Sequence, residues 1–236
     1  MRALLVRIGA DQSVYGGCWN GPVDPITREF VYVPIPDDGP FHPGMATPYS
    51  MVSRHLSGKW PALLATLAPL NMHLDPDFAH LTYGDQGQRA LQISSKLGSG
   101  DLLVFYAGLK DIHASPRLIY AIIGLMEIEQ IVPTVLVSPG TWHQNAHTRR
   151  SSPYGPHDIV VRGKRGTSGR CERAIPIGHF AKRAYRALPA LLTAWGGLGV
   201  AGGYLQRSAR LPEFLNAAQF YHWFKRQKVA LLPRNN

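Results

Sequence analysis

Hydrophobic residues occur along this chain mainly in short runs of strand length. The longest run, residues 118–128, is interrupted by Gly124 and followed by acids, so it predicts a buried strand and not a membrane span. In a second run, Pro34 and Pro36 favour a position at a sheet edge, because proline has no N–H to donate. The predicted strands are residues 2–8, 30–35, 102–106, 118–131, 134–138, 158–162 and 173–178.

Helical spacing is less frequent and is strongest in two segments. Residues 86–97 place Leu91 and Leu97 on an inward face and end at Gly98, and residues 212–228 carry an aromatic face. The predicted helices are residues 57–68, 86–97, 179–194 and 212–228, with a proline-rich loop at residues 37–50. There is no internal repeat and no long linker. The sequence therefore predicts a single α/β domain over residues 1–236, with a mixed β-sheet flanked by helices and a basic helical C-terminal region.

Composition restricts the class of protein. Hydrophobic residues make up 45% of the 236 residues and charged residues only 17%, which is typical of a folded globular chain and not of a disordered one. The first residues lack the apolar core and cleavage site of a signal peptide. The two cysteines, Cys18 and Cys171, are far apart and form no CxxC pair, which favours free thiols in a reducing compartment. We therefore expect a cytoplasmic protein.

Charge is distributed unevenly along the chain. Residues 1–148 contain 9 Lys/Arg and 12 Asp/Glu, a net charge of −3, whereas residues 149–236 contain 16 Lys/Arg and 3 Asp/Glu, a net charge of +13. A charge difference of this size creates a positive electrostatic field on one part of the molecule, and phosphate backbones bind to such a field with release of counterions. Contact with anionic lipid, or a charged surface that serves only solubility, are the alternative explanations. We expect the basic portion to bind nucleic acid.

A glycine-containing loop after the first predicted strand is the first candidate catalytic segment. Asp11 lies in this loop, where glycines let a nucleotide come close, and a carboxylate there could activate water or stabilise an oxocarbenium ion. Asp85 is a second candidate, although its place before a predicted helix also suits a helix N-cap. Asp11 could equally cap a turn. Side chains of this first loop that could contact a base are Gln12, Tyr15, Trp19 and Asn20.

A second group of candidates is polar, aromatic and basic, which suits contacts with bases and phosphates. In residues 141–150, Trp142 or His147 could stack on a flipped base and Asn145 could pair with its edge. Cations and an amide in three segments predict phosphate contacts, with a solvated basic face as the alternative. These DNA-binding candidates are Arg149, Arg150, Lys164, Arg165, Arg170, Gln206, Arg207 and Arg210.

Two cofactor-like patterns lack their usual context. The glycines at 197, 199 and 202 match GxGxxG but follow a predicted helix instead of a strand, and His143 and His147 have metal-ligand spacing without the usual glutamate. We therefore expect neither a metal nor an organic cofactor.

Several segments resemble one known family. They are RIGADQS, GGCWNGPVD, FVYVPIP, LTYGD, GDLLVFYAGL with LIYAIIG, NAHTRR and GGYLQRSARLP, and together they span nearly the whole chain. In these segments the chain resembles the third of the nucleotide modification associated domains, a bacterial and phage family linked to hypermodified DNA bases. The resemblance implies a DNA glycosylase used in phage defence. It would flip a bulky modified base, such as glycosylated hydroxymethylcytosine, and hydrolyse its N-glycosidic bond to leave an abasic site.

Other functions stay open beside this one. The turn at Asp11 is loosely similar to the water-activating motif of uracil-DNA glycosylases, but its residue order differs and it lacks their proline. The strand pair at residues 102–128 resembles PUA-like domains, which read a modified base without cutting it. An enzyme that installs a modification would need a donor site, and the sequence contains none in proper context. No lysine stands out as a Schiff-base nucleophile, so water is the expected nucleophile.

Overall fold

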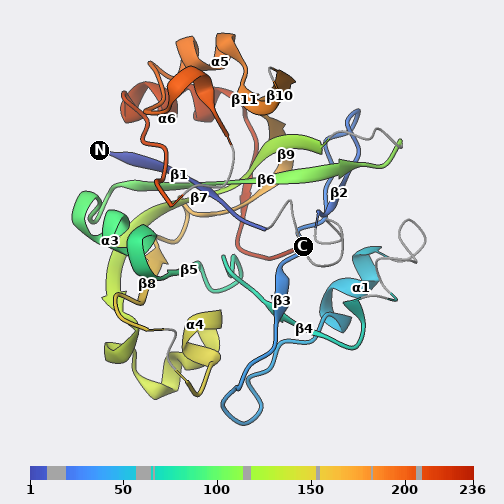
Figure 1. The fold of residues 1–236 in the computed structure, drawn as a ribbon, viewed down its shortest axis with the longest axis vertical. Helices are drawn as coiled ribbons and strands as arrows, with labels where there is room; N and C mark the ends of the chain where they lie inside the picture. Colours follow the sequence, from blue (N-terminus) through green and yellow to red (C-terminus); the bar gives the residue numbers. More distant parts are fainter. Residues whose placement is uncertain are drawn as a thin grey trace.

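The computed structural model describes residues 1–9, 20–56, 65, 67–113, 118–152, 155–181, 183–205 and 209–236. Within them, one mixed sheet of eight strands crosses the middle of the molecule (Figure 1). Its main order is β1-β6-β7-β8-β5, with β1 parallel to β6 and the following neighbours antiparallel. The strands of this sheet are β1 (Ala3–Arg7), β2 (Pro22–Val23), β5 (Thr82–Asp85), β6 (Leu102–Asp111), β7 (Leu118–Pro133), β8 (Ile159–Gly163), β9 (Gly169–Pro176) and β12 (Leu231–Leu232).

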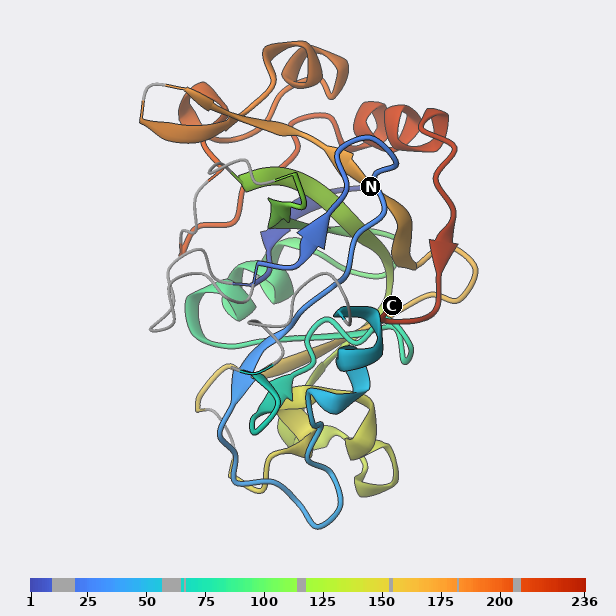
Figure 2. The ribbon, with the colours of Figure 1, turned by 90° about the vertical axis from the view of Figure 1, so that its right-hand side faces the viewer.

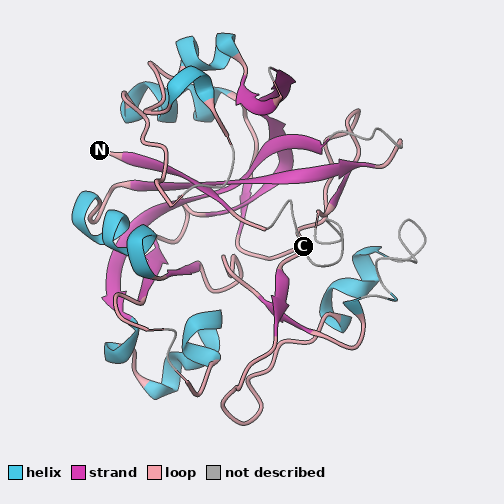
Figure 3. Ribbon diagram, viewed as in Figure 1, coloured by secondary structure: helices cyan, strands magenta, loops and turns pink. Residues whose placement is uncertain are grey.

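Smaller elements lie around this sheet (Figure 3). Two further strand pairs are β3 (Ile35–Asp37) with β4 (Asn71–His73), and β10 (Gly178–Ala181) with β11 (Ala184–Ala187). The α-helices are α1 (Ser50–Leu56), α3 (Gly87–Lys96), α4 (Ala146–Arg149), α5 (Pro189–Ala194) and α6 (Ala217–Arg226). Short 3-10 helices are η1 (Thr134–Leu136), η2 (Pro139–Gln144) and η3 (Ala201–Gly203).

The sheet is buried on both faces, because its strands alternate apolar side chains between two cores. On β6, Leu103 and Phe105 point into the first core, whereas Leu102, Val104 and Tyr106 point into the second. Helices α1 and α3 and the β3–β4 pair cover the first core. Helices α5 and α6 and the β10–β11 hairpin cover the second, so the sheet is the middle layer (Figure 2).

Strand β7 connects the two ends of the sheet. It is 16 residues long, and it pairs with β6 and β9 along its first part and with β8 along its last. Register shifts occur at Ile122–Gly124 and Ile128–Gln130, where a strand of this length has to bend. The far end of the sheet therefore carries β5, whose residues form part of the candidate site.

The fold class expected from the sequence, a mixed α/β arrangement, is confirmed. The strands expected at residues 2–8, 102–106, 118–131 and 158–162 and the helices expected at residues 86–97 and 212–228 are present with shifted ends. In the expected strand at residues 30–35, only Ile35 is in a strand, namely β3. The loop expected at residues 37–50 ends at α1, and most of the helix expected at residues 57–68 lies outside the described residues.

Two expected elements are wrong. Residues 134–138 contain the 3-10 helix η1 instead of a strand. Residues 179–194 form most of the β10–β11 hairpin and the short helix α5 instead of one helix. The hairpin is favoured by packing, because Tyr185 stacks on Tyr120 of β7 with ring centroids 3.9 Å apart. Arg183, just before β11, has a positive φ of 61°, which a continuous helix would not allow. No helix among the described residues is long and apolar enough to cross a membrane.

Candidate active site

A polar cavity of about 340 Å³ opens beside the first core, where the end of β1 meets β3, β4, β5 and α4. Most of its walls come from elements that are distant in sequence. The lining residues are Arg7, Ile8, Gly9, Pro34, Ile35, Pro36, His73, Asp75, Tyr83, Gly84, Asp85, Gln86, Arg89, His147 and Arg150. A cavity of this size with converging polar groups is typical of a small-molecule or nucleoside site.

Two histidines in the cavity wall each have a carboxylate behind them. Nδ1 of His73 lies 3.0 Å from Oδ2 of Asp37, and Nδ1 of His147 lies 2.5 Å from Oδ1 of Asp158. Since a carboxylate oxygen accepts from a ring N–H, Nδ1 is the donor in each pair, and in the neutral tautomer of such a ring Nε2 carries the lone pair. Burial lowers the pKa of His147, but the hydrogen bond with Asp158 and the charge of Asp75 outweigh it, so this pKa is raised above its ordinary value.

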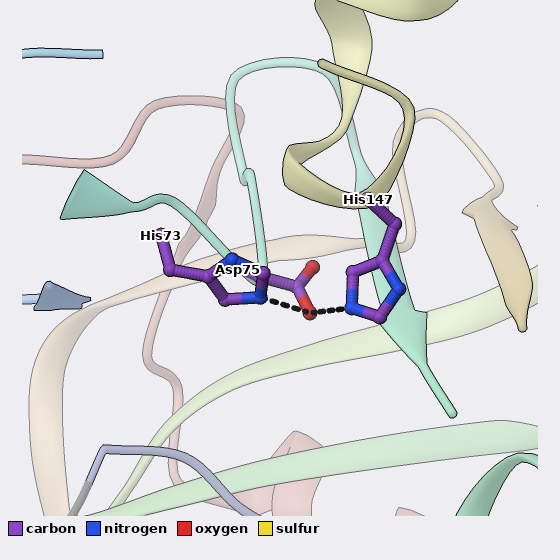
Figure 4. Close-up of side chains that lie close together, drawn as sticks. All are labelled: His73, Asp75 and His147. Atoms are coloured by element: carbon purple, nitrogen blue, oxygen red, sulfur yellow. Dashed lines mark ion pairs between the residues drawn. The ribbon is translucent and has the colours of Figure 1, made fainter. Parts of the chain in front are cut away.

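Asp75 lies between these two rings. Its Oδ2 is 3.9 Å from Nε2 of His147 and 4.0 Å from Nε2 of His73, and Figure 4 shows both rings directed at this oxygen. Its Oδ1 accepts hydrogen bonds from the Gly84 amide at 2.7 Å and from Nδ2 of Asn145 at 3.1 Å. Burial raises the pKa of Asp75 to about 6, although the charges of the two histidines act in the opposite direction.

Local structure holds this group tightly. A Cβ at Gly84 would lie 2.3 Å from Cδ2 of His147, so only glycine allows the ring to pack directly on β5. Asn145 is the N-cap of α4, and its Oδ1 accepts from the amide of His147 at 2.9 Å. Its Nδ2 also donates to Oγ1 of Thr82 at 3.2 Å. Glycine and asparagine thus fix the positions of both the carboxylate and the imidazole.

A second carboxylate, Asp85, stands at the end of β5 in the same cavity. It accepts a hydrogen bond from the Tyr83 hydroxyl at 2.5 Å and pairs with Nε of Arg89 at 3.0 Å. Burial raises the pKa of Tyr83 well above its ordinary value, so this phenol stays protonated and donates. The expectation that Asp85 caps the following helix is wrong, because the N-cap of α3 is Gln86 and no side chain caps it. Tyr83 and Arg89, and not the following helix, therefore hold the Asp85 carboxylate in the cavity wall.

Positive charge reaches the same cavity from Arg89, which pairs with Asp85, and from two further arginines. Arg7 extends from β1, donates to the hydroxyl of Tyr120 at 2.8 Å and lies over its ring. Arg150 follows α4 and pairs with Asp37, the carboxylate that also holds His73. Carboxylates and guanidiniums thus share one wall, an arrangement that can hold an anionic or sugar-bearing ligand near fixed negative charges.

The base-contacting residues expected from the sequence are divided between different places. Asp11, Gln12, Tyr15 and Trp19 lie outside the described residues. Of the others, His147 lines the cavity, whereas Asn145 stands behind it with 1% exposure, and Asn20 is buried and donates to the Gly108 carbonyl at 2.7 Å. Trp142 stacks on His42 and donates to a backbone carbonyl, and it does not line the cavity.

The expected phosphate-contacting residues are also divided. Arg149 is buried, and its guanidinium lies 2.6 Å from Oδ2 of Asp77. Arg170 is buried too, 4.1 Å above the ring of Phe30, and burial lowers its pKa to about 10. Both differ from the exposed phosphate contacts that we expected, because each guanidinium is engaged within the fold.

The remaining basic candidates lie at the surface or outside the described part of the chain. Lys164 and Arg165 are exposed in the turn between β8 and β9, where Lys164 pairs with Glu127 at 3.0 Å. Arg210 is exposed, and Arg150 lines the cavity. Gln206 and Arg207 lie outside the described residues. Among the basic candidates that the structure describes, Lys164, Arg165 and Arg210 are therefore the ones at the surface, where a phosphate backbone could reach them.

Sequence reasoning missed His73 and Asp75. A signal for them does exist in the segment HLDPD, where residues two apart on an extended chain share a side and so present an imidazole and a carboxylate together. No local pattern indicates that Asp37 and Asp158 stand behind the two histidines, since those contacts join separate parts of the chain.

Comparison with known proteins places the chain in a family. The family model for nucleotide modification associated domain 3 matches residues 2–228. The chain belongs to the nucleotide modification associated domain 3 family. The matched residues include every residue of the cavity and almost all of the basic portion. No curated protein and no solved structure matches the chain.

Proposed function

We propose that this member of the nucleotide modification associated domain 3 family is a DNA glycosylase that removes a bulky modified base in phage defence. The observation that carries the proposal is the cavity with Asp85 fixed in its wall. Enzymes that act on the glycosidic bond of a base in duplex DNA have to turn the nucleotide out of the stack and into a pocket. The cavity volume of about 340 Å³ lies within the range of pockets that enclose small ligands, as a site for a flipped nucleoside has to do.

The reaction needs negative charge beside the sugar. As the C1′–N bond breaks, its electron pair leaves with the base and the deoxyribose becomes an oxocarbenium-like cation. Asp85 can stabilise that cation, because Arg89 and Tyr83 hold its carboxylate in one place. Water then forms the new C1′–O bond and gives up one proton, while the departing base takes up one proton, so an abasic site and a free base are the products.

Asp11 is our candidate for the carboxylate that accepts the proton of water. It lies two residues after Gly9, which lines the cavity, and it is outside the described residues. In this assignment Asp11 acts as the general base and Asp85 as the electrostatic stabiliser. The two roles are separable by mutation, since loss of a general base and loss of a fixed charge respond differently to pH.

The basic portion supplies DNA affinity in this proposal. Burial acts to raise the pKa of Glu127, but its hydrogen bond with Lys164 and the charges of Lys164 and Lys225 lower it, so both lysines lie near this carboxylate. Arg165 adds an exposed guanidinium in the turn between β8 and β9. We propose that this surface holds the duplex backbone while the cavity takes the flipped nucleotide.

The direct test is incubation of the protein with duplexes that differ only in one cytosine. That cytosine is plain, hydroxymethylated or glucosylated hydroxymethylcytosine, and strand cleavage by alkali reveals abasic sites. The proposal predicts abasic sites in the glucosylated duplex and none in the plain one. Selective tight binding of the glucosylated duplex without base release would overturn the catalytic part and favour a reader of modified bases.

A further inference from the structure

We propose that His73, Asp75 and His147 form a binding site for one divalent transition-metal ion, with zinc or iron(II) as the matching class. The ligand atoms are Nε2 of both histidines and Oδ2 of Asp75, which all lie within 4.8 Å of one another. They come from β4, from the residues after it and from α4, and all three side chains line the cavity. This inference is independent of base excision.

The first support is the direction of the lone pairs. With Nδ1 of each ring directed at a carboxylate, Nε2 is the nitrogen left to bind a metal, and in both rings Nε2 faces Oδ2 of Asp75 (Figure 4). The separations of 3.9 and 4.0 Å are too long for hydrogen bonds, and they bring three electron-rich atoms around one point. A divalent cation at that point would be coordinated by all three atoms.

The second support is the shell behind the ligands. Metal-bound histidines commonly donate their other nitrogen to a carboxylate, which fixes the tautomer and raises the basicity of the ligand atom. Asp37 and Asp158 provide this for His73 and His147 respectively. Asp75 has a matching arrangement, because two hydrogen bonds occupy Oδ1 and leave Oδ2 directed toward the histidines.

The donor set indicates the kind of ion. Two imidazoles and one carboxylate suit zinc or iron(II), whereas magnesium and calcium prefer oxygen ligands alone. Three protein ligands leave positions open toward the cavity, as in catalytic sites and unlike the four ligands of structural zinc. Tetrahedral coordination would place ligand atoms about 3.4 Å apart. The two histidine–Asp75 pairs, at 3.9 and 4.0 Å, must therefore close by about 0.5 Å, and the two Nε2 atoms, which lie within 4.8 Å of each other, by up to about 1.4 Å.

The test is metal content of the purified, tag-free protein. We expect close to one equivalent of a transition metal by elemental mass spectrometry, or uptake of one equivalent of Co²⁺ by chelator-treated protein with the visible absorption of a low-coordinate site. His73→Gln and Asp75→Asn should abolish this binding. His80→Gln is the matched control, because His80 forms a similar pair with Asp77 at 3.0 Å but does not line the cavity.

Variants of the carboxylates behind the ligands make the test sharper. Asp158→Asn should weaken Co²⁺ affinity by about 10–100-fold while the protein stays folded by circular dichroism. Absence of metal in the purified protein together with no Co²⁺ uptake would overturn the proposal. So would undiminished binding in folded His73→Gln, or an equal loss in His80→Gln. None of these readouts depends on DNA cleavage, so failure here and failure of the proposed function are distinguishable.

Discussion

Replacing Arg149 by methionine distinguishes a buried structural cation from a phosphate contact. The Arg149 side chain is 8% exposed and its partner Asp77 is 1% exposed, with 2.6 Å between their closest atoms. Removing one partner of a buried ion pair leaves an uncompensated charge and costs about 3–5 kcal/mol. Methionine keeps most of the side-chain volume, so the lost charge pairing dominates the change.

The surroundings of Asp77 place the expected loss at the low end of that range. Its carboxylate also receives hydrogen bonds from the amides of Ala79 and His80, from the His80 ring and from Nδ2 of Asn235. We therefore expect a loss of about 3 kcal/mol in the free energy of unfolding. At about 2–4 °C per kcal/mol for a chain of this size, Tm should fall by about 6–12 °C.

The assay pairs thermal unfolding with the salt dependence of DNA binding, and Arg165→Met is the matched control. Arg165 is exposed, so its loss should change stability by less than about 0.5 kcal/mol. It should also reduce the slope of log affinity against log salt by about 0.9 if it neutralises one phosphate. Arg149→Met should leave that slope unchanged. A stable Arg149→Met protein with a reduced slope would refute the structural assignment of Arg149.

Two further substitutions probe the candidate site, and one labelling experiment probes the core. Gly84→Ala should displace the His147 ring, lower the free energy of unfolding by about 1–3 kcal/mol in thermal unfolding, and impair base excision. Gly98→Ala is the control, because a Cβ there meets nothing within 4 Å, and it should leave both stability and excision unchanged. Asn145→Ala should cost about 1–2 kcal/mol through the lost N-cap; unchanged stability would contradict its role in α4. Burial raises the pKa of the Cys171 thiol to about 12, so this thiol should resist alkylation at pH 8 until denaturant is added. The measurement uses a Cys18→Ser variant, in which Cys171 is the one remaining thiol. Rapid labelling of the native protein would contradict this expectation.

Much of the sheet could be predicted from the sequence because its strands are locally encoded. Strands β1, β6, β7 and β8 each coincide with a run of apolar residues, and a run of this kind indicates a buried strand without knowledge of which strands it pairs with. The β10–β11 hairpin could not be predicted in this way, because it depends on stacking of Tyr185 on Tyr120. Local spacing in that segment favours a helix, and the tertiary contact outweighs it.

The candidate site was predicted only in part, for a related reason. His147 and Asp85 stand out locally, but pairing of β5 with β8 and the position of β4 are what bring them beside His73 and Asp75. Charge counting had a similar limit. It could not show that Arg149 is buried against Asp77, since their ion pair joins segments far apart in sequence.

The most direct test of the account is the single-turnover rate of base release from glucosylated duplex DNA by Asp85→Asn. The parent protein and Glu129→Gln, which removes an exposed carboxylate of β7, are the references. We predict a loss of roughly 10²-fold or more for Asp85→Asn, with DNA affinity retained, because the carboxylate proposed to stabilise the sugar cation is gone. The Glu129→Gln rate should equal that of the parent. A folded Asp85→Asn protein that releases the base at the parental rate would contradict the account.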